Sequence, residues 1–500
     1  MKTLGAICLF CLLSHLSYAQ KEPVRQTINF SGLKRNELIK NLERVLTEPR
    51  PAEEQLSQRD AQAKRQAEAA IALMEMGAHK QIWPLLRHRA DPGLRSYLIR
   101  DIGRSQIPVD VIIDQLKIEK DVSIRRALLL TLGGFSTKQL PAQKRKPFVD
   151  WLLQVYRSDP DPGIHSAIDW LLRHGRQGYE NRKIDWRQGK VLSTIDSSLS
   201  GRPSKDRNWY VTAKGHTMAI FRGPIEFVMG SPGNEPGRDK TDLEARHRQR
   251  IPRSFAVAAK EVTIQQFQQF FDAHPAIKQR ARAAGQRDPT RTGPHMKRKN
   301  LDEDCPQVLI TWFEAAQYCN WLSQQEGIPK EEWCYPSLEE IKEGMVLPTD
   351  YLHRTGYRMP TEAEWEYVCR AGASTSRFYG QSDELLREYA WHTGNSFNER
   401  PWPVGQLKPN DFGLFDVYGN VWEWGQDWVK QYRSEPVDTI WVDNEDSPLT
   451  VSKDFKRSRK GGSFTYSADY MRSAGRSDGY IPDERRDSVG FRVARTIAEK

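Results

Sequence analysis

Cysteine is scarce in this chain, and long apolar runs are missing beyond its first twenty residues. Only six cysteines occur among 500 residues, and two of them, Cys8 and Cys11, fall in the N-terminal apolar stretch. The other four all lie in the C-terminal half: Cys305, Cys319, Cys334 and Cys369. These four permit two disulfides in any of three pairings, or four buried thiols. No later segment approaches eighteen consecutive apolar residues, which excludes a membrane span after the first twenty residues.

The first nineteen residues differ from the rest of the chain. Lys2 precedes an apolar run from Leu4 to Leu13, and the small residues of Ser17-Tyr18-Ala19 stand before Gln20. This pattern predicts a secretory signal peptide over residues 1–19, and the run is too short to span a bilayer. No cysteine follows at the position a lipoprotein needs. We therefore expect a secreted or periplasmic protein, with an uncleaved anchor as the alternative.

The positive charge of the chain is spread out. Its net charge is +10 over 500 residues, and local excesses at residues 278–299 and 453–460 lack apolar periodicity. Such segments are typical of solvated loops, so we expect no nucleic-acid partner. Anionic cell-surface polymers remain as candidate partners.

The N-terminal half has a helical pattern from about residue 33 to residue 178, with apolar residues three and four apart. Three similar segments begin at Asp91, Asp121 and Asp161, and each Asp is placed to cap a helix. The pattern resembles HEAT-type helical repeats, which stack because one helix pair cannot bury its own apolar stripe. We predict a HEAT-like domain over 33–178 that serves as a docking surface for a protein or peptide, followed by a linker over 179–207.

The C-terminal half reads as an α+β domain with long loops. We expect short strands at 209–212, 218–221 and 225–231, and further strands that lead into helices near 261–267 and 307–312. Thr263 and Thr361 are expected to cap helices, the second of which runs over 362–369. A third helix is expected over 313–324.

The segment Gly413–Trp424 organises this domain. Its bulky rings require a packed core or a ligand groove, and Gly419-Asn420 supplies a tight turn between them. Four oxygens fall within eight residues, and they form the hard ligand set that calcium prefers. The candidate ligands are Asp416, the carbonyls of Gly419 and Val421, and Glu423. The alternative is that Asp416 and Glu423 accept hydrogen bonds from turn amides.

Three motifs together resemble the formylglycine-generating enzyme (sulfatase-modifying factor) family over about residues 208–497. They are the segment just described, Gly356–Tyr367 upstream, and Lys460–Phe464 followed by Val489–Arg492 downstream. The resemblance implies a variant of the C-type-lectin fold and a structural calcium ion at the four oxygens named above. It also implies that Trp422 and Ser463 border a peptide-binding cleft.

The chain departs from this family at its catalytic centre. The resembled family oxidises cysteine with copper held by two thiolates that follow Gly-Gly-Ser, and the first of these positions is Tyr466 here. The second falls at Met471 without a gap, or in a gap of about three residues if Arg472 and Arg476 are aligned to the family's arginines. No cysteine follows Cys369 in either alignment. Copper is therefore not expected. The histidines form no close pair that predicts an iron site, and Ser463 lacks a nucleophile-elbow motif. Glu362, Glu364 and Glu366 open a helix, where capping is the expected role.

We therefore predict a multidomain, exported protein with HEAT-like repeats and a formylglycine-generating-enzyme-like domain. The domain is expected to be a pseudoenzyme that binds or scaffolds, with Trp422, Ser463 and Tyr466 lining its groove. The alternative is an oxidoreductase of the sulfatase-modifying-factor family, with a noncopper site or with cysteine-to-formylglycine activity on sulfatases.

Overall fold

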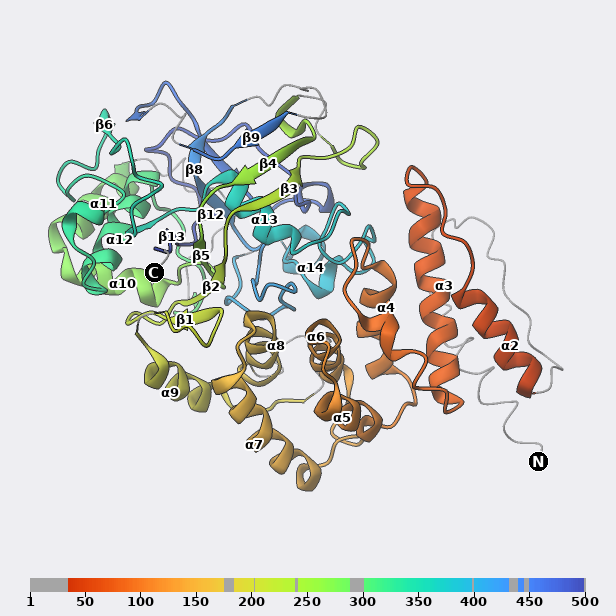
Figure 1. The fold of residues 1–500 in the computed structure, drawn as a ribbon. Coiled ribbons are helices and arrows are strands. Elements are labelled where there is room, and N and C mark those ends of the chain that lie inside the picture. The colour runs from red at the N-terminus through yellow and green to blue at the C-terminus, as the bar shows by residue number, and fades with distance from the viewer. Residues whose placement is uncertain are drawn as a thin grey trace.

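The computed structural model describes residues 35–174, 184–201, 203–238, 242–287, 301–397, 400–430, 439–444 and 449–498. In these ranges the chain forms an all-helical N-terminal region that packs against an α+β C-terminal domain (Figure 1). The predicted signal peptide lies outside the described residues. None of the helices in these ranges has both the length and the apolar character that crossing a membrane requires.

The N-terminal region is built from paired helices. α3 packs on α4, α5 on α6 and α7 on α8, and α4, α6 and α8 lie in a row beside the C-terminal domain (Figure 1). The α-helices are α2 Arg35–Leu46, α3 Leu56–Glu75, α4 Gly93–Asp101, α5 Val109–Ile118, α6 Val122–Thr131, α7 Ala142–Ser158, α8 Pro162–Leu172 and α9 Gly189–Leu199. Short 3-10 helices are η1 Trp83–Leu86, η2 Ile102–Arg104 and η3 Leu132–Gly134.

The three repeated segments form the second helix of each pair. Asp121 caps α6 by accepting from the amides of Ser123 and Ile124, and Asp161 caps α8 by accepting from Ile164. These two predicted caps are confirmed. The third is wrong, because Pro92 is the N-cap of α4, and Asp91 accepts from the amide of Gly93 and from the side chain of Arg50.

The segment predicted as a linker contains α9. Leu192 and Ile195, three residues apart, are buried on the side of α9 that contacts α7 and β1. These two buried apolar side chains anchor α9, although the serine and glycine content of this stretch is typical of a loop. The all-helical region accordingly extends to about residue 200.

The C-terminal domain contains four small sheets. The largest has the strand order β1-β2-β5-β13-β7, the next two have the orders β11-β8-β12 and β3-β4-β9, and β10 pairs with β6. The strands are β1 Trp209–Val211, β2 Thr217–Phe221, β3 Ile225–Met229, β4 His247–Ile251, β5 Phe255–Ala258, β6 Met345–Val346, β7 Tyr357–Arg358, β8 Trp422–Trp428, β9 Ile440–Val442, β10 Thr450–Val451, β11 Arg457–Lys460, β12 Val489–Gly490 and β13 Ala494–Thr496.

Most α-helices described in this domain begin at capping boxes. In three of them a threonine side chain accepts a hydrogen bond from the backbone amide of the third helical residue. The side chain of that third residue in turn accepts from the backbone amide of the threonine. The capping threonines are Thr263, Thr311 and Thr361. The α-helices are α10 Ile264–Ala273, α11 Pro275–Arg287, α12 Trp312–Gln325, α13 Glu362–Arg370 and α14 Thr393–Ser396, and the 3-10 helices are η4 Asp242–Glu244, η6 Lys330–Glu332, η7 Leu386–Glu388 and η8 Ala468–Tyr470. The predicted caps Thr263 and Thr361 are confirmed. The strand expected at 307–312 is wrong, because Leu309 adopts a left-handed conformation with φ of 60°.

Candidate functional site

A tight turn carries the chain into β8. Asp416 and Asn420 both have φ of 53°, and Gly419 has φ of 73°. A Cβ atom at Gly419 would lie 2.0 Å from the carbonyl oxygen of Trp391, so only glycine fits between these backbones. The turn thereby places Trp422, which is fully buried, at the start of β8.

Four aromatic residues, here called the Trp422 cluster, surround this position: Trp422, Tyr466, Tyr470 and Tyr480. The ring of Tyr466 meets Trp422 edge-on at 5.4 Å, and Tyr470 lies 4.8 Å from Tyr466. Tyr466 and Tyr480 are half-buried, while Tyr470 is 44% exposed. Trp422 is thus the floor of the cluster, and the three tyrosines form its surface.

The two residues expected at the family's thiolate positions offer no thiolate. Tyr466 presents a phenol, and Met471 is fully buried with its thioether against Gly462, where an added Cβ would lie 2.7 Å from the sulfur. Ser463 is also buried, and its hydroxyl shares a 2.9 Å hydrogen bond with that of Thr465. This site therefore offers no thiolate and no activated hydroxyl.

All four cysteines of the described residues are free, buried thiols: Cys305, Cys319, Cys334 and Cys369. Burial raises the pKa of Cys305, Cys334 and Cys369 to about 12, and raises that of Cys319 well above its usual value. These thiols are therefore protonated at neutral pH, and the structure contains no disulfide among them.

The predicted calcium ligands differ in their surroundings. Asp416 accepts from the amide of Gly405 through Oδ2 at 2.7 Å, while its buried Oδ1 has no hydrogen-bond partner. Glu423 is held by Arg492 at 2.5 and 2.6 Å and by the indole of Trp365 at 2.8 Å. One candidate carboxylate is thus partly free, and the other anchors a buried guanidinium.

A third carboxylate, which the sequence did not single out, lies beside this turn. Glu261 accepts from the side chain of Asn420 at 2.8 Å and from the amide of Val421 at 3.3 Å. Burial, with the nearby charges of Asp416 and Glu423, raises the pKa of Glu261 well above its usual value. Burial also raises the pKa of Asp416 to about 6. The turn therefore gathers three buried carboxyl groups beside one guanidinium, that of Arg492, and burial disfavours the ionised forms of two of them.

The three glutamates of α13 have structural partners. Glu364 belongs to the capping box of Thr361 and pairs with Arg358 at 2.6 Å, which confirms its predicted capping role. Glu362 pairs with an arginine at 2.6 Å and Glu366 with another at 2.7 Å. Carboxylates held in this way are unsuited to proton transfer.

Sequence reasoning missed Arg459 and Tyr480. The guanidinium of Arg459 lies between two rings, with its central carbon 4.7 Å from the Trp422 centroid and 3.8 Å from that of Tyr480. All four residues of β11 are buried, so no alternation of burial along this strand singles out Arg459. Tyr480 comes from a distant loop, and no local pattern links it to Trp422.

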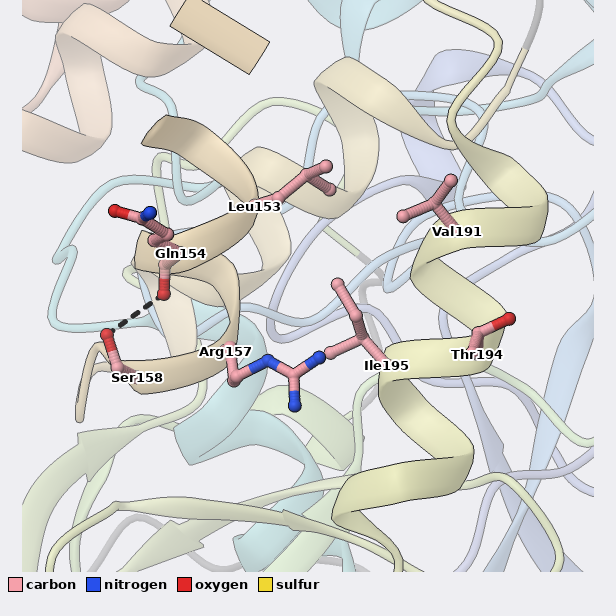
Figure 2. A pocket seen from close by; sticks show the side chains of 7 residues that line it. All are labelled: Leu153, Gln154, Arg157, Ser158, Val191, Thr194 and Ile195. Atoms are coloured by element: carbon pink, nitrogen blue, oxygen red, sulfur yellow. Dashed lines mark hydrogen bonds between the residues drawn. The ribbon is translucent and has the colours of Figure 1, made fainter. Parts of the chain in front are cut away.

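A shallow groove of about 620 Å³ lies elsewhere, between α7 and α9 (Figure 2). Its lining residues are Leu153, Gln154, Arg157, Ser158, Val191, Thr194 and Ile195. In Figure 2 the hydroxyl of Ser158 donates to the carbonyl of Gln154, within its own helix. The lining lacks a carboxylate, histidine or thiol, so this groove has no means of acid–base or nucleophilic chemistry.

Comparison with known proteins shows which family the C-terminal domain is similar to. The sequence pattern of the sulfatase-modifying factor enzyme 1-like domain matches residues 212–497. The formylglycine-generating enzyme of Mus musculus is 29% identical over 204 residues, which cover 38% of this chain and 44% of the mouse protein. That of Streptomyces coelicolor is 34% identical over 200 residues, which cover 37% of this chain and 60% of that enzyme.

Among solved structures, PvdO from Pseudomonas aeruginosa aligns with a TM-score of 0.42 and 22% identity, over 58% of this chain and 98% of that chain. The chain spans less than two thirds of the length of the two enzymes it matches. The domain pattern covers more than half of the chain and includes the Gly419 turn, Trp422 and the Gly-Gly-Ser motif. The chain therefore belongs to the FGE-sulfatase family of sulfatase-modifying factor enzyme 1-like domains.

Proposed function

We propose that the C-terminal domain binds a ligand at the Trp422 cluster and does not oxidise cysteine. One observation carries the proposal: the ring of Tyr466 packs edge-on against Trp422, with the ring centroids 5.4 Å apart. By resemblance to the family, Tyr466 stands where the first copper-binding cysteine is expected. With Tyr470 it forms a partly exposed aromatic surface. Such rings stack on sugars, peptides and other flat groups.

Copper does not fit the residues of this site. Cu(I) requires soft sulfur ligands, and a pair of them is needed to replace the two family thiolates. Met471 supplies a single buried thioether, and Tyr466 supplies an oxygen. The four cysteine thiols are buried and protonated, so none of them replaces the missing pair.

The enzymatic alternative is tested directly. Purified protein is loaded with copper, or with iron, and incubated with a sulfatase peptide that contains Cys-x-Pro-x-Arg. We expect no aldehyde by mass spectrometry. Aldehyde formation with either metal would overturn the proposal in favour of an oxidoreductase.

Binding is tested on glycan and peptide arrays, with variants of matched exposure. Tyr470 and Val228 are each 44% exposed, so substituting either one leaves the core intact. We expect Tyr470→Ala to weaken binding about tenfold, the size of a lost aromatic contact, and Val228→Ala to bind as the wild type does. Equal binding by both variants would place the ligand elsewhere.

We also propose a structural calcium ion at Asp416, the carbonyls of Gly419 and Val421, and Glu423. The free Oδ1 of Asp416 and the buried carboxyl groups gathered around it support this proposal. Calcium is expected to raise the unfolding temperature relative to a chelator, and Asp416→Asn to remove that difference. Asp478→Asn, an exposed control, is expected to keep it.

We further propose that the protein is exported and that its N-terminal region is a scaffold of HEAT type. Lys2, the apolar run and the small residues before Gln20 support export. The row α4, α6 and α8 contacts the chain's own C-terminal domain, so a protein partner would dock on the outer helices. N-terminal sequencing of the exported protein should begin at Gln20.

A further inference from the structure

Arg459 differs from most buried arginines of this protein. Ten arginines of the described residues are buried, and eight of these have a carboxylate oxygen within 2.8 Å. The two exceptions are Arg457 and Arg459, which stand two residues apart on β11. Burying a guanidinium without a paired anion is costly, so two such residues together require an explanation.

The side chain of Arg459 lies between the rings of Trp422 and Tyr480 and is 5% exposed. Cation–π contact with the two rings holds the guanidinium in place but leaves its hydrogen-bond donors unused. Its Nε and Nη1 atoms have no acceptor, and neither does the indole Nε1 of Trp422. Two neighbouring side chains, Arg459 and Trp422, thus hold three buried donors without an acceptor.

One edge of this guanidinium faces the surface. Its Nη2 atom lies 3.9 Å from Oδ1 of Asp478, too far for a hydrogen bond, and the Asp478 side chain is 75% exposed. The other oxygen of Asp478 accepts from Lys456 at 3.1 Å. This carboxylate is therefore a loose counter-ion, which a better-placed anion can displace.

We propose that Arg459 binds the oxyanion of a small ring-shaped ligand, namely a carboxylate- or sulfate-bearing sugar, while the tyrosines of the Trp422 cluster contact its ring. This inference rests on the proposed binding function and assigns its ligand class. Arginine matches planar oxyanions with two parallel donors, and aromatic faces suit a sugar ring. Arg457, two residues away, adds a second buried guanidinium without a carboxylate partner, held over the Trp312 ring and by the Gln426 carbonyl.

The backbone around Arg459 favours a small ring over an extended peptide. The edge of β11 that does not pair with β8 is already bonded, because the Arg457 amide donates to the Tyr480 carbonyl at 2.7 Å and Lys460 bridges to Arg476. A peptide strand therefore finds no free edge to extend here. The surface that remains consists of the tyrosine rings and the edge of the guanidinium.

The test is calorimetric titration of the full-length mature protein with glucuronate, glucose 6-sulfate and uncharged glucose. We expect one anionic sugar to bind about tenfold more tightly than glucose, because a hydrogen bond to a charged group contributes about that much. The preference is expected to shrink as ionic strength rises. If glucuronate binds more tightly than glucose 6-sulfate, the ligand class is a carboxylate-bearing sugar; the opposite order indicates a sulfate-bearing sugar.

Two variants move the affinity in opposite directions. Arg459→Met keeps the packing volume and is expected to abolish the preference for the anionic sugar, whereas Arg387→Met, an exposed control, is expected to retain it. Asp478→Asn removes the competing carboxylate at the surface and is expected to tighten anion binding about twofold to threefold. Because Asp478 is exposed, this second test holds even where Arg459→Met fails to fold.

Three results would overturn the inference: no preference for either anionic sugar, no binding at millimolar concentration, or unchanged preference in Arg459→Met together with no gain in Asp478→Asn. The proposed function fails separately. If uncharged ligands bind and depend on Tyr470 but not on Arg459, binding stands and the anion site is wrong. If neither Tyr470→Ala nor any array ligand shows an effect, the binding function itself is wrong.

Discussion

Both carboxylate oxygens of Asp411 accept hydrogen bonds from the guanidinium of Arg95, at 2.8 and 2.9 Å. Arg95 lies on α4, and Asp411 lies in the C-terminal domain, 316 residues away in sequence. Arg126 of α6 approaches the same carboxylate to 3.5 Å, and His88 approaches it to 3.8 Å. One buried acid thus joins two helices of the row to the domain that carries the Trp422 cluster.

Replacing this acid should destabilise the whole protein. Asp411→Asn leaves Arg95 buried without its anion, and we expect the free energy of unfolding to fall by about 3 to 5 kcal/mol. Denaturant titration measures the change. The control is Asp110→Asn, whose side chain is 52% exposed and pairs with Lys144 at 2.6 Å. Its expected effect is below about 1 kcal/mol, and equal losses in the two variants would contradict a special role for the buried pair.

A second prediction concerns the close approach of α8 to the same segment. A Cβ atom at Gly163 would lie 2.4 Å from the carbonyl oxygen of Asp411, so Gly163→Ala must push the two regions apart. We expect a loss of about 1 to 3 kcal/mol in unfolding free energy. Gly233→Ala is the matched control, because nothing lies within 4 Å of its added Cβ. Faster proteolysis between the two regions in Gly163→Ala alone would locate the effect.

A third prediction follows from His165, whose ring is stacked between Tyr156 at 3.9 Å and Trp209 at 3.7 Å. Burial lowers the pKa of His165 to about 4, with Asp196, Asp169 and Arg173 as the nearby charges. The folded state therefore holds the neutral ring, while the unfolded chain takes up a proton below its ordinary pKa of 6.5. Stability should fall as the pH drops from 6.5 towards 4, by roughly 3 kcal/mol from this residue.

The measurement is denaturant unfolding at pH 7.5 and pH 4.5 for the wild type and His165→Gln. We expect the variant to lose less stability between the two pH values than the wild type. His216, whose pKa burial also lowers to about 3, remains in both proteins and cancels in the comparison. Identical pH dependence in the two proteins would assign the acid sensitivity to other groups.

Local patterns predicted the helices of this protein better than its contacts. Thr263 and Thr361 were recognisable as caps, because a capping box involves residues only three apart. Asp121 and Asp161 were recognisable as caps for the same reason, whereas the cap expected at Asp91 was wrong. The partner of Arg95 could not be predicted from the sequence. Asp411 lies 316 residues beyond Arg95 and belongs to no repeated segment.

In the candidate site, too, residues within or near sequence motifs were predicted and contacts between distant segments were not. Trp422 and Tyr466 were predicted to line one groove from the family resemblance, and the structure brings their rings to 5.4 Å. Arg459 was not predicted, because its importance comes from lacking a carboxylate that other buried arginines have. The lack of a close carboxylate beside Arg459 can be recognised only from the three-dimensional structure, which gives all of its neighbours.

The last prediction concerns the four cysteines. Burial raises the pKa of Cys305, Cys334 and Cys369 to about 12 and that of Cys319 well above its usual value, so thiolate is scarce at pH 8. Because disulfide reagents react with thiolate, the native protein should react slowly or not at all. Unfolding in guanidinium should release four thiols in the mature chain, or six where Cys8 and Cys11 are retained.

The number and speed of reacting thiols separate the alternatives. Four thiols in unreduced, unfolded protein agree with the structure, whereas none or two would indicate disulfides formed after export. A pair of thiols that reacts rapidly in the folded state and is protected by Cu(I) would mean that soft ligands are available after all. That result would restore cysteine oxidation as a function, since it removes the chemical reason for excluding copper.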